Sequence, residues 1–103
     1  MKIYISGKIT GLTPEEYEHN FYLYERQIKA HGHEPINPLN ILPFDENHKW
    51  TDYMRADIKA LMECDAVFAM KNYRESIGAR IEVGLARDLD IPVIERMGDL
   101  PLA

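Results

Sequence analysis

Glu82 is the first residue whose position suggests chemistry. It lies in a segment, 78–89, with the spacing of a helix, on the face that also carries Gly78, Leu85, Ala86 and Leu89. A charged side chain rarely borders a core without a partner. Glu82 is therefore expected to be either an ion-pair partner or a functional carboxylate.

Asp57 shows the same anomaly on a second predicted helix, which begins at Thr51 or Asp52 and runs to about Glu63. The apolar inner face of that helix is expected to consist of Met54, Ile58, Leu61 and Met62. Two such acidic residues, on helices that should flank one sheet edge, predict a carboxylate pair. Paired carboxylates cleave glycosidic bonds, because one attacks or stabilises the sugar carbon while the other transfers protons.

A loop with two glycines follows the first predicted strand. Its sequence is Ser6-Gly7-Lys8-Ile9-Thr10-Gly11. Glycines let a backbone approach a ligand closely, and Lys8 adds a positive charge. The spacing is neither that of a P-loop nor that of a dinucleotide fingerprint. A ligand-binding loop and an ordinary strand-to-helix turn are both compatible with this pattern.

Ser76 precedes the helix that carries Glu82 and occupies an N-cap position. The free N–H groups of the turn that follows could hold an anion such as phosphate. The small residues Gly78, Gly84 and Ala86 lower helix propensity, so close packing or close ligand approach is expected to require them. Taken alone, the pattern favours helix–sheet packing over ligand binding.

Strands and helices are predicted to alternate along the chain. One predicted helix begins with a capping box formed by Thr13 and Glu16, with Pro14 at its first position, and ends near Gly32. A long loop follows at 39–49, and Trp50 lies at its end. The four expected strands are 2–5, a short extended segment at 34–38, 65–70 and 91–94. The alternation predicts an α/β layer fold with a mostly parallel sheet, in which ligands bind beyond the carboxyl ends of the strands.

Composition narrows the class of protein. The chain has 103 residues, a net charge of −5 and one cysteine, Cys64. We expect a single domain over 1–103, cytoplasmic, with no membrane span, no metal site and no nucleic-acid polymer as partner. The acidic charge still allows a small phosphorylated ligand.

Five motifs resemble the nucleoside 2-deoxyribosyltransferase-like superfamily, and most closely its small bacterial and phage DUF4406 branch. The most specific is Ser-x-Gly-x-x-x-Glu-x-Gly-x-Ala, at 76–86; the others are 2–11, 32–38, 53–58 and 64–67. The superfamily also includes the deoxynucleoside 5′-monophosphate N-glycosidases. The resemblance implies a flavodoxin-like, Rossmann-like three-layer sandwich with a sheet of four to five strands, N-glycosidic bond cleavage, no cofactor, and a homodimer or larger homo-oligomer.

The resemblance also implies roles for individual residues. Glu82 matches the nucleophile that forms a covalent deoxyribosyl intermediate, and Asp57 matches the aspartate that assists proton transfer. The positions that match substrate-binding residues are Tyr4 close to the base, Gly7, Lys8, Ile9 and Gly11 in the first loop, and Ser76 and Gly78 at the phosphate site. Arg80 departs from the pattern, since the glycosidases have a small residue there; it either adds a phosphate contact or blocks the pocket.

The function predicted from the sequence is cleavage of a (deoxy)nucleoside 5′-monophosphate into free base and sugar phosphate. The positive residue in the first loop and the capped helix favour a phosphate-bearing substrate over a plain nucleoside. Two alternatives stay open: a nucleoside 2-deoxyribosyltransferase that exchanges bases, and a nucleotide-binding module without catalysis. A third interpretation is purely structural, with Asp57 and Glu82 paired to Arg55 or Arg80.

Overall fold

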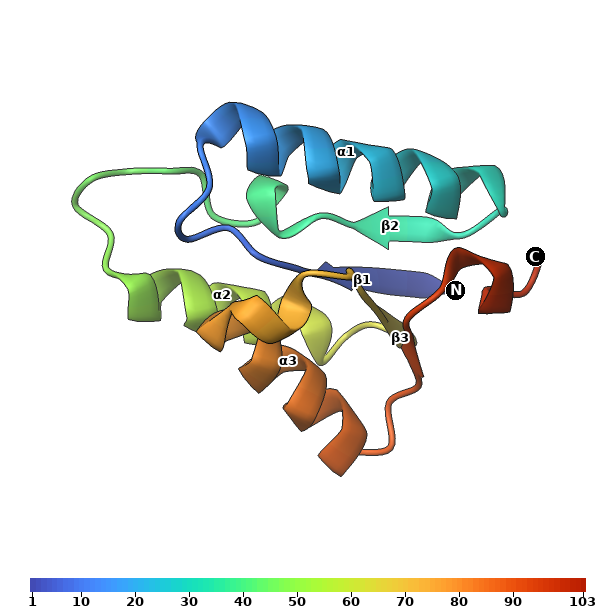
Figure 1. The fold of residues 1–103 in the computed structure, drawn as a ribbon. Helices are drawn as coiled ribbons and strands as arrows, with labels where there is room; N and C mark the ends of the chain where they lie inside the picture. The colour runs from blue at the N-terminus through green and yellow to red at the C-terminus, as the bar shows by residue number, and fades with distance from the viewer.

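The computed structural model describes residues 1–103 and contains one sheet of four parallel strands, in the order β2-β1-β3-β4 (Figure 1). The strands are β1 (Lys2–Ser6), β2 (Glu34–Ile36), β3 (Ala66–Ala69) and β4 (Val93–Ile94). The helices between them are α1 (Pro14–Ala30), α2 (Trp50–Leu61) and α3 (Ile77–Asp88). This order confirms the predicted α/β fold with a parallel sheet. None of the three helices has the length and apolar character that crossing a membrane requires.

The sheet lies between two helical layers, which confirms the three-layer prediction. Helix α1 covers one face, and α2 and α3 cover the other (Figure 1). Side chains of β1 alternate between these layers, because successive residues of a strand point to opposite faces. Ile3 and Ile5 pack with Phe21 of α1, whereas Tyr4 packs with residues of α2 and α3.

Strand β3 is buried on both faces, as its continuous apolar sequence predicts. It pairs with β1 on one side and with β4 on the other. Phe68 points toward α1, where its ring centroid lies 5.0 Å from that of Tyr24. Val67 points toward α3 and packs with Val83.

Helix α1 begins with the predicted capping box. The Thr13 hydroxyl accepts a hydrogen bond from the Glu16 amide at 3.2 Å, and the Glu16 carboxylate accepts one from the Thr13 amide at 2.9 Å. Pro14 is the first helical residue, where its missing N–H is harmless. Past the helix end, which is close to the predicted one, Gly32 has a φ of +87°, a left-handed conformation that favours glycine.

Several expected boundaries and orientations are wrong. Helix α2 begins at Trp50 rather than at Thr51 or Asp52, so Trp50 is helical and does not belong to the loop before it. Met62 is 41% exposed, because Met54, Asp57 and Leu61 define the buried side of α2 and Met62 lies about 100° around the helix from Leu61. Leu89 is 52% exposed, because it follows the last residue of α3.

The C-terminal tail docks against the rest of the fold. It contains a 3-10 turn, Met97–Asp99, followed by the buried side chain of Leu100. Leu100 packs into the apolar cluster between the sheet and α1. Burial of one leucine side chain contributes about 2 kcal/mol, which explains why this segment docks.

Candidate active site

The topology brings the two candidate loops together at one edge of the sheet. Strand β1 lies between β2 and β3, so the connections that leave β1 and β3 start side by side at the carboxyl ends of these strands. A hydrogen bond joins the two loops: the Lys8 amide donates to the Asn72 side-chain oxygen at 3.0 Å. Parallel α/β sheets bind their ligands at this kind of position.

Glu82 lies on the inner side of α3 and points at the sheet; only 5% of its surface is exposed. The Tyr4 hydroxyl donates a hydrogen bond to Glu82 Oε2 at 2.7 Å. The Ser6 hydroxyl donates to Glu82 Oε1 at 2.8 Å. Each carboxylate oxygen therefore has its own hydroxyl donor, and both donors come from one face of β1.

Asp57 lies on the buried side of α2 and is 8% exposed. Burial, and then the negative charge of Glu82, raise its pKa from 3.8 to about 7. Burial also raises the pKa of Glu82 from 4.5 to about 7, although the hydrogen bonds from Tyr4 and Ser6 act in the opposite direction. The two carboxyl groups are thus close enough to interact electrostatically, and near neutral pH the pair can hold and release a proton.

Tyr4 is fully buried, and its hydroxyl serves the carboxylate pair. Burial and the adjacent charge of Glu82 raise the Tyr4 pKa well above its usual value, so the hydroxyl stays a donor. The resemblance also places Tyr4 close to a base; that role stays a prediction.

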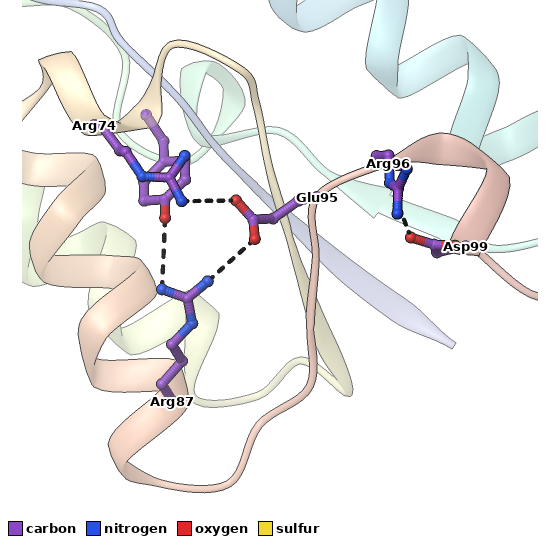
Figure 2. Close-up of polar contacts among 6 residues, drawn as sticks. Arg74, Arg87, Glu95, Arg96 and Asp99 are labelled. Carbon is purple, nitrogen blue, oxygen red and sulfur yellow. Dashed lines mark hydrogen bonds and ion pairs between the residues drawn. The ribbon is translucent and has the colours of Figure 1, made fainter.

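No basic side chain neutralises the carboxylate pair. The ion pairs lie elsewhere. Arg74 and Arg87 pair with the two oxygens of Glu95, and Arg96 pairs with Asp99 (Figure 2). Lys8 pairs with Glu75. Arg55 and Arg80 are both exposed and pair with neither Asp57 nor Glu82. The interpretation that both acids are ordinary salt-bridge residues is therefore wrong.

The first loop is held by packing and by an ion pair. A Cβ atom on Gly7 would lie 2.2 Å from Met70 Sδ, so close packing at the strand end requires a glycine here. Gly11 has a φ of +93°, which favours glycine in this turn. The Lys8 amine lies 3.6 Å from a carboxylate oxygen of Glu75, and Ile9 packs on the α1 side of the sheet.

The N-terminus of α3 adjoins the N-terminus of α2. Ser76 is the N-cap, as predicted, and its hydroxyl accepts a hydrogen bond from the Ala79 amide at 3.2 Å. A Cβ atom on Gly78 would lie 2.9 Å from Met54 Sδ and 3.7 Å from the Trp50 ring. Packing of the two helices thus accounts for Gly78, and Arg80 extends into solvent one turn beyond the cap.

Two hollows lie on the α1 side of the molecule. One, of about 500 Å³, is an open hollow beside α1 with the acidic residues Glu15, Glu18 and Glu25 in its wall. The other, of about 200 Å³, lies between α1 and the loop after β3 and includes Met70 and Asn72. Neither is lined by Glu82 or Asp57, so the carboxylate pair, and not a hollow, defines the candidate site.

A family described as "Domain of unknown function (DUF4406)" matches residues 1–95. The chain belongs to this family. A comparison with curated proteins finds no match.

Solved structures place this DUF4406 chain in the nucleoside 2-deoxyribosyltransferase-like superfamily. One is a 2-deoxyribosyltransferase from the psychrotolerant bacterium Bacillus psychrosaccharolyticus, with a TM-score of 0.69 and 25% identity over 90% of this chain and 69% of that chain. A conserved protein from Enterococcus faecalis V583 has a TM-score of 0.69 and 22% identity over 90% of this chain and 60% of that one. The 2-desoxiribosyltransferase from Leishmania mexicana has a TM-score of 0.66 and 20% identity over 89% of this chain and 61% of that one. The last two show the fold alone, and the DUF4406 chain spans about three fifths of their length.

Ser6 is the polar residue of the site that sequence reasoning missed. Because Ser6 precedes Gly7, the sequence indicates the start of a turn and suggests no role for the serine side chain. One signal could have identified it: Ser6 follows Tyr4 by two residues in a strand, so both must point to the same face. That face is covered by the helix that carries Glu82.

Proposed function

We propose that this chain cleaves the N-glycosidic bond of a 2′-deoxynucleoside or its 5′-monophosphate, with Glu82 as the nucleophile. The observation that carries the proposal is a buried carboxylate without any cationic partner, fixed by two hydroxyl donors beside a second carboxylate. A structural ion pair would not need this arrangement, whereas attack on a sugar carbon does. The structural likeness to a 2-deoxyribosyltransferase also supports the N-glycosidic bond as the bond that is cleaved.

The proposed reaction has two steps. In the first, a Glu82 oxygen forms a bond to C1′ as the bond from C1′ to the base nitrogen breaks. The electron pair of that bond leaves with the base, which takes a proton from Asp57. A carboxyl whose pKa is about 7 suits this proton transfer near neutral pH.

In the second step, an acceptor attacks C1′ and the glycosyl ester on Glu82 breaks, which regenerates the carboxylate. A second base as acceptor gives deoxyribosyl transfer, and water gives hydrolysis. The acceptor loses a proton to Asp57, so both residues return to their first state. Two displacements at C1′ give net retention of configuration.

We propose base transfer as the overall reaction, supported by the likeness to the bacterial transferase. Hydrolysis of a 5′-monophosphate is the second candidate. It is supported by Lys8 in the loop after β1 and by the amides of Ile77 and Gly78 at the start of α3, with the exposed Arg80 in the first turn of that helix. On this reading Arg80 contacts phosphate.

The test is incubation of the protein with 2′-deoxynucleosides and their 5′-monophosphates, with and without a second base, followed by chromatography. Base exchange that requires the second base establishes the transferase, and free base from a monophosphate alone establishes the hydrolase. Glu82→Gln is the matched variant, since it keeps shape but removes the nucleophile. Thermal stabilisation by a nucleotide without any product would replace the proposal with a nucleotide-binding module.

We also propose a homodimer or larger homo-oligomer, as the superfamily resemblance implies. Three exposed apolar side chains near the start of α2 and α3 support this assembly: Trp50, Ile77 and Ile81. Light scattering after size exclusion measures the mass directly. A monomer at all concentrations, with Ile77→Ser unchanged in mass, would contradict it.

A further inference from the structure

Ser6 is fully buried and is the last residue of β1. Its backbone is fixed by the sheet, since its carbonyl accepts a hydrogen bond from the Met70 amide at 2.9 Å. Its hydroxyl lies 2.8 Å from Glu82 Oε1 and 3.4 Å from the Ala79 carbonyl oxygen. The side chain is therefore enclosed between the sheet and the helix that carries Glu82.

A serine hydroxyl has one hydrogen, so it can donate fully to only one of these two acceptors. The carboxylate oxygen is both nearer and charged, and hydrogen bonds to charged groups are the stronger ones. The two acceptors within reach of the Ser6 hydroxyl are the Glu82 carboxylate and the Ala79 carbonyl oxygen, and both belong to α3. The hydroxyl is thus explained by Glu82 and not by packing.

We propose that Ser6 is a positioning residue that fixes Glu82 Oε1 and follows its charge, an inference that deepens the proposed function. While Glu82 is ionised, the Ser6 hydroxyl donates to Oε1. While Glu82 is protonated, the hydroxyl turns toward the Ala79 carbonyl and its lone pair accepts the carboxylic proton. The Ser6 hydroxyl can therefore form a hydrogen bond with the Glu82 carboxyl group in either protonation state, without a change in the backbone.

The consequence for the reaction lies in the breakdown of the glycosyl ester. When the bond from C1′ to the carboxylate oxygen breaks, the electron pair returns to Glu82 as negative charge. The Ser6 and Tyr4 hydroxyls are in place to donate to that charge, one to each oxygen. The groups that face Glu82 from the packed elements are Tyr4 on β1 and Asp57 on α2, and none of them is a cation. Loss of Ser6 would leave Glu82 with a single donor against the charge of Asp57.

The test measures Glu82 itself and needs no substrate. The side-chain carboxyl carbon of Glu82 is followed by ¹³C NMR across a pH titration, in wild type and in Ser6→Ala. We expect the midpoint in Ser6→Ala to rise by about one pH unit, since a donor to the charged form is lost. Ser6→Thr, which keeps a hydroxyl, should restore a midpoint near that of wild type. A Ser6→Ala titration that superimposes on wild type would overturn the inference.

Ser76→Ala is the matched control, because it removes the other serine of the chain, which is the N-cap of the helix that carries Glu82. The Ser76→Ala variant loses the hydrogen bond that caps α3, but Ser76 has no hydrogen bond to Glu82. The titration midpoint of Glu82 should therefore stay at its wild-type value. An equal rise in Ser76→Ala would mean that loosening of α3 moves the titration, and would overturn the role of Ser6. If Ser6→Ala does not fold, Ser6→Cys takes its place, since it keeps an unbranched side chain of similar shape with a weaker donor. A midpoint unchanged in Ser6→Cys would then overturn the inference, and a raised one would support it.

Kinetics separate this inference from the proposed function. In an active protein, Ser6→Ala should lower kcat at least about tenfold while KM changes little, with the acid limb of the pH profile moved upward. A raised KM at unchanged kcat would overturn the positioning role. A wild-type protein without activity would instead refute the proposed function, and the titration would still decide the role of Ser6.

Discussion

Replacement of Glu82 by glutamine should stabilise the protein at alkaline pH. Burial raises the pKa of Glu82 from 4.5 to about 7. Between these two values the folded protein binds more protons than the unfolded chain, so the free energy of unfolding falls as pH rises through this window. Glutamine has nearly the same shape, does not titrate, and can pair with both the Tyr4 and Ser6 hydroxyls.

The size of the effect follows from the pKa difference. One pKa unit corresponds to 1.36 kcal/mol, so Glu82 alone lowers the stability of wild type by about 2.5 kcal/mol between pH 5 and pH 8. The variant should not show this part of the loss. Asp57 still titrates in the variant, because burial and not Glu82 is the larger cause of its raised pKa. The variant is therefore expected to lose stability less steeply than wild type, and not to be independent of pH.

Urea unfolding at pH 5 and pH 8 measures both proteins. Groups that do not interact with Glu82 cancel in the difference between the two pH dependences. Asp57 adds to that difference in the same direction, because the charge of Glu82 raises its pKa in wild type alone. Glu63→Gln is the control, because Glu63 is exposed and its replacement should leave the pH dependence parallel to wild type. Equal pH dependences for wild type and Glu82→Gln would refute the reasoning, since they would mean that burial does not disfavour the charge of Glu82.

Three further substitutions test close packing, helix propensity and helix capping. Gly7→Ala should lower the free energy of unfolding by about 1 to 3 kcal/mol, because its Cβ would lie 2.2 Å from the buried Met70 Sδ; an unchanged urea midpoint would contradict this. Gly84→Ala should raise stability by about 0.5 to 1 kcal/mol, because no atom lies within 4 Å of its Cβ and alanine favours the helix; a lower melting temperature would count against it. Thr13→Ala should cost about 1 kcal/mol through loss of the α1 cap, measured by urea unfolding, and full retention of stability would show that the capping box is dispensable.

The fold was largely predictable, because its signals are local. The capping box at Thr13 and the apolar sequence of β3 each specify one element, and alternation of such elements implies a parallel sheet. The errors lie at element ends and in orientation. Met62 fits helical spacing but lies on the exposed side of α2, and Leu100 docks through a contact between distant parts of the chain. Such choices depend on tertiary packing, which periodicity does not encode.

The candidate site was predictable only in part. Asp57 and Glu82 stand out in the sequence because each is an acid on an apolar helical face. Their partners on β1 do not stand out: Tyr4 resembles a core aromatic, and Ser6 resembles the start of a turn. Their hydrogen bonds to Glu82 join residues separated by 78 and 76 positions, a relation that only the packing of α3 on the sheet creates.

The energetics of Glu82 bear on what the site is for. A carboxylate at this position destabilises the folded protein at neutral and alkaline pH, because burial disfavours its charge and no cation offsets that cost. Asp57 adds to the cost, because the negative charges of the two acids repel one another. An apolar or amide side chain at position 82 would make a more stable protein of the same fold.

The two hydroxyl donors show that the surrounding structure binds the ionised carboxylate by hydrogen bonds and does not neutralise its charge with a cation. The proposed nucleophilic role of Glu82 needs this state, because a lysine or arginine bound to the carboxylate would lower its reactivity toward C1′. The arrangement is therefore better explained by a requirement for a reactive carboxylate than by any requirement of the fold.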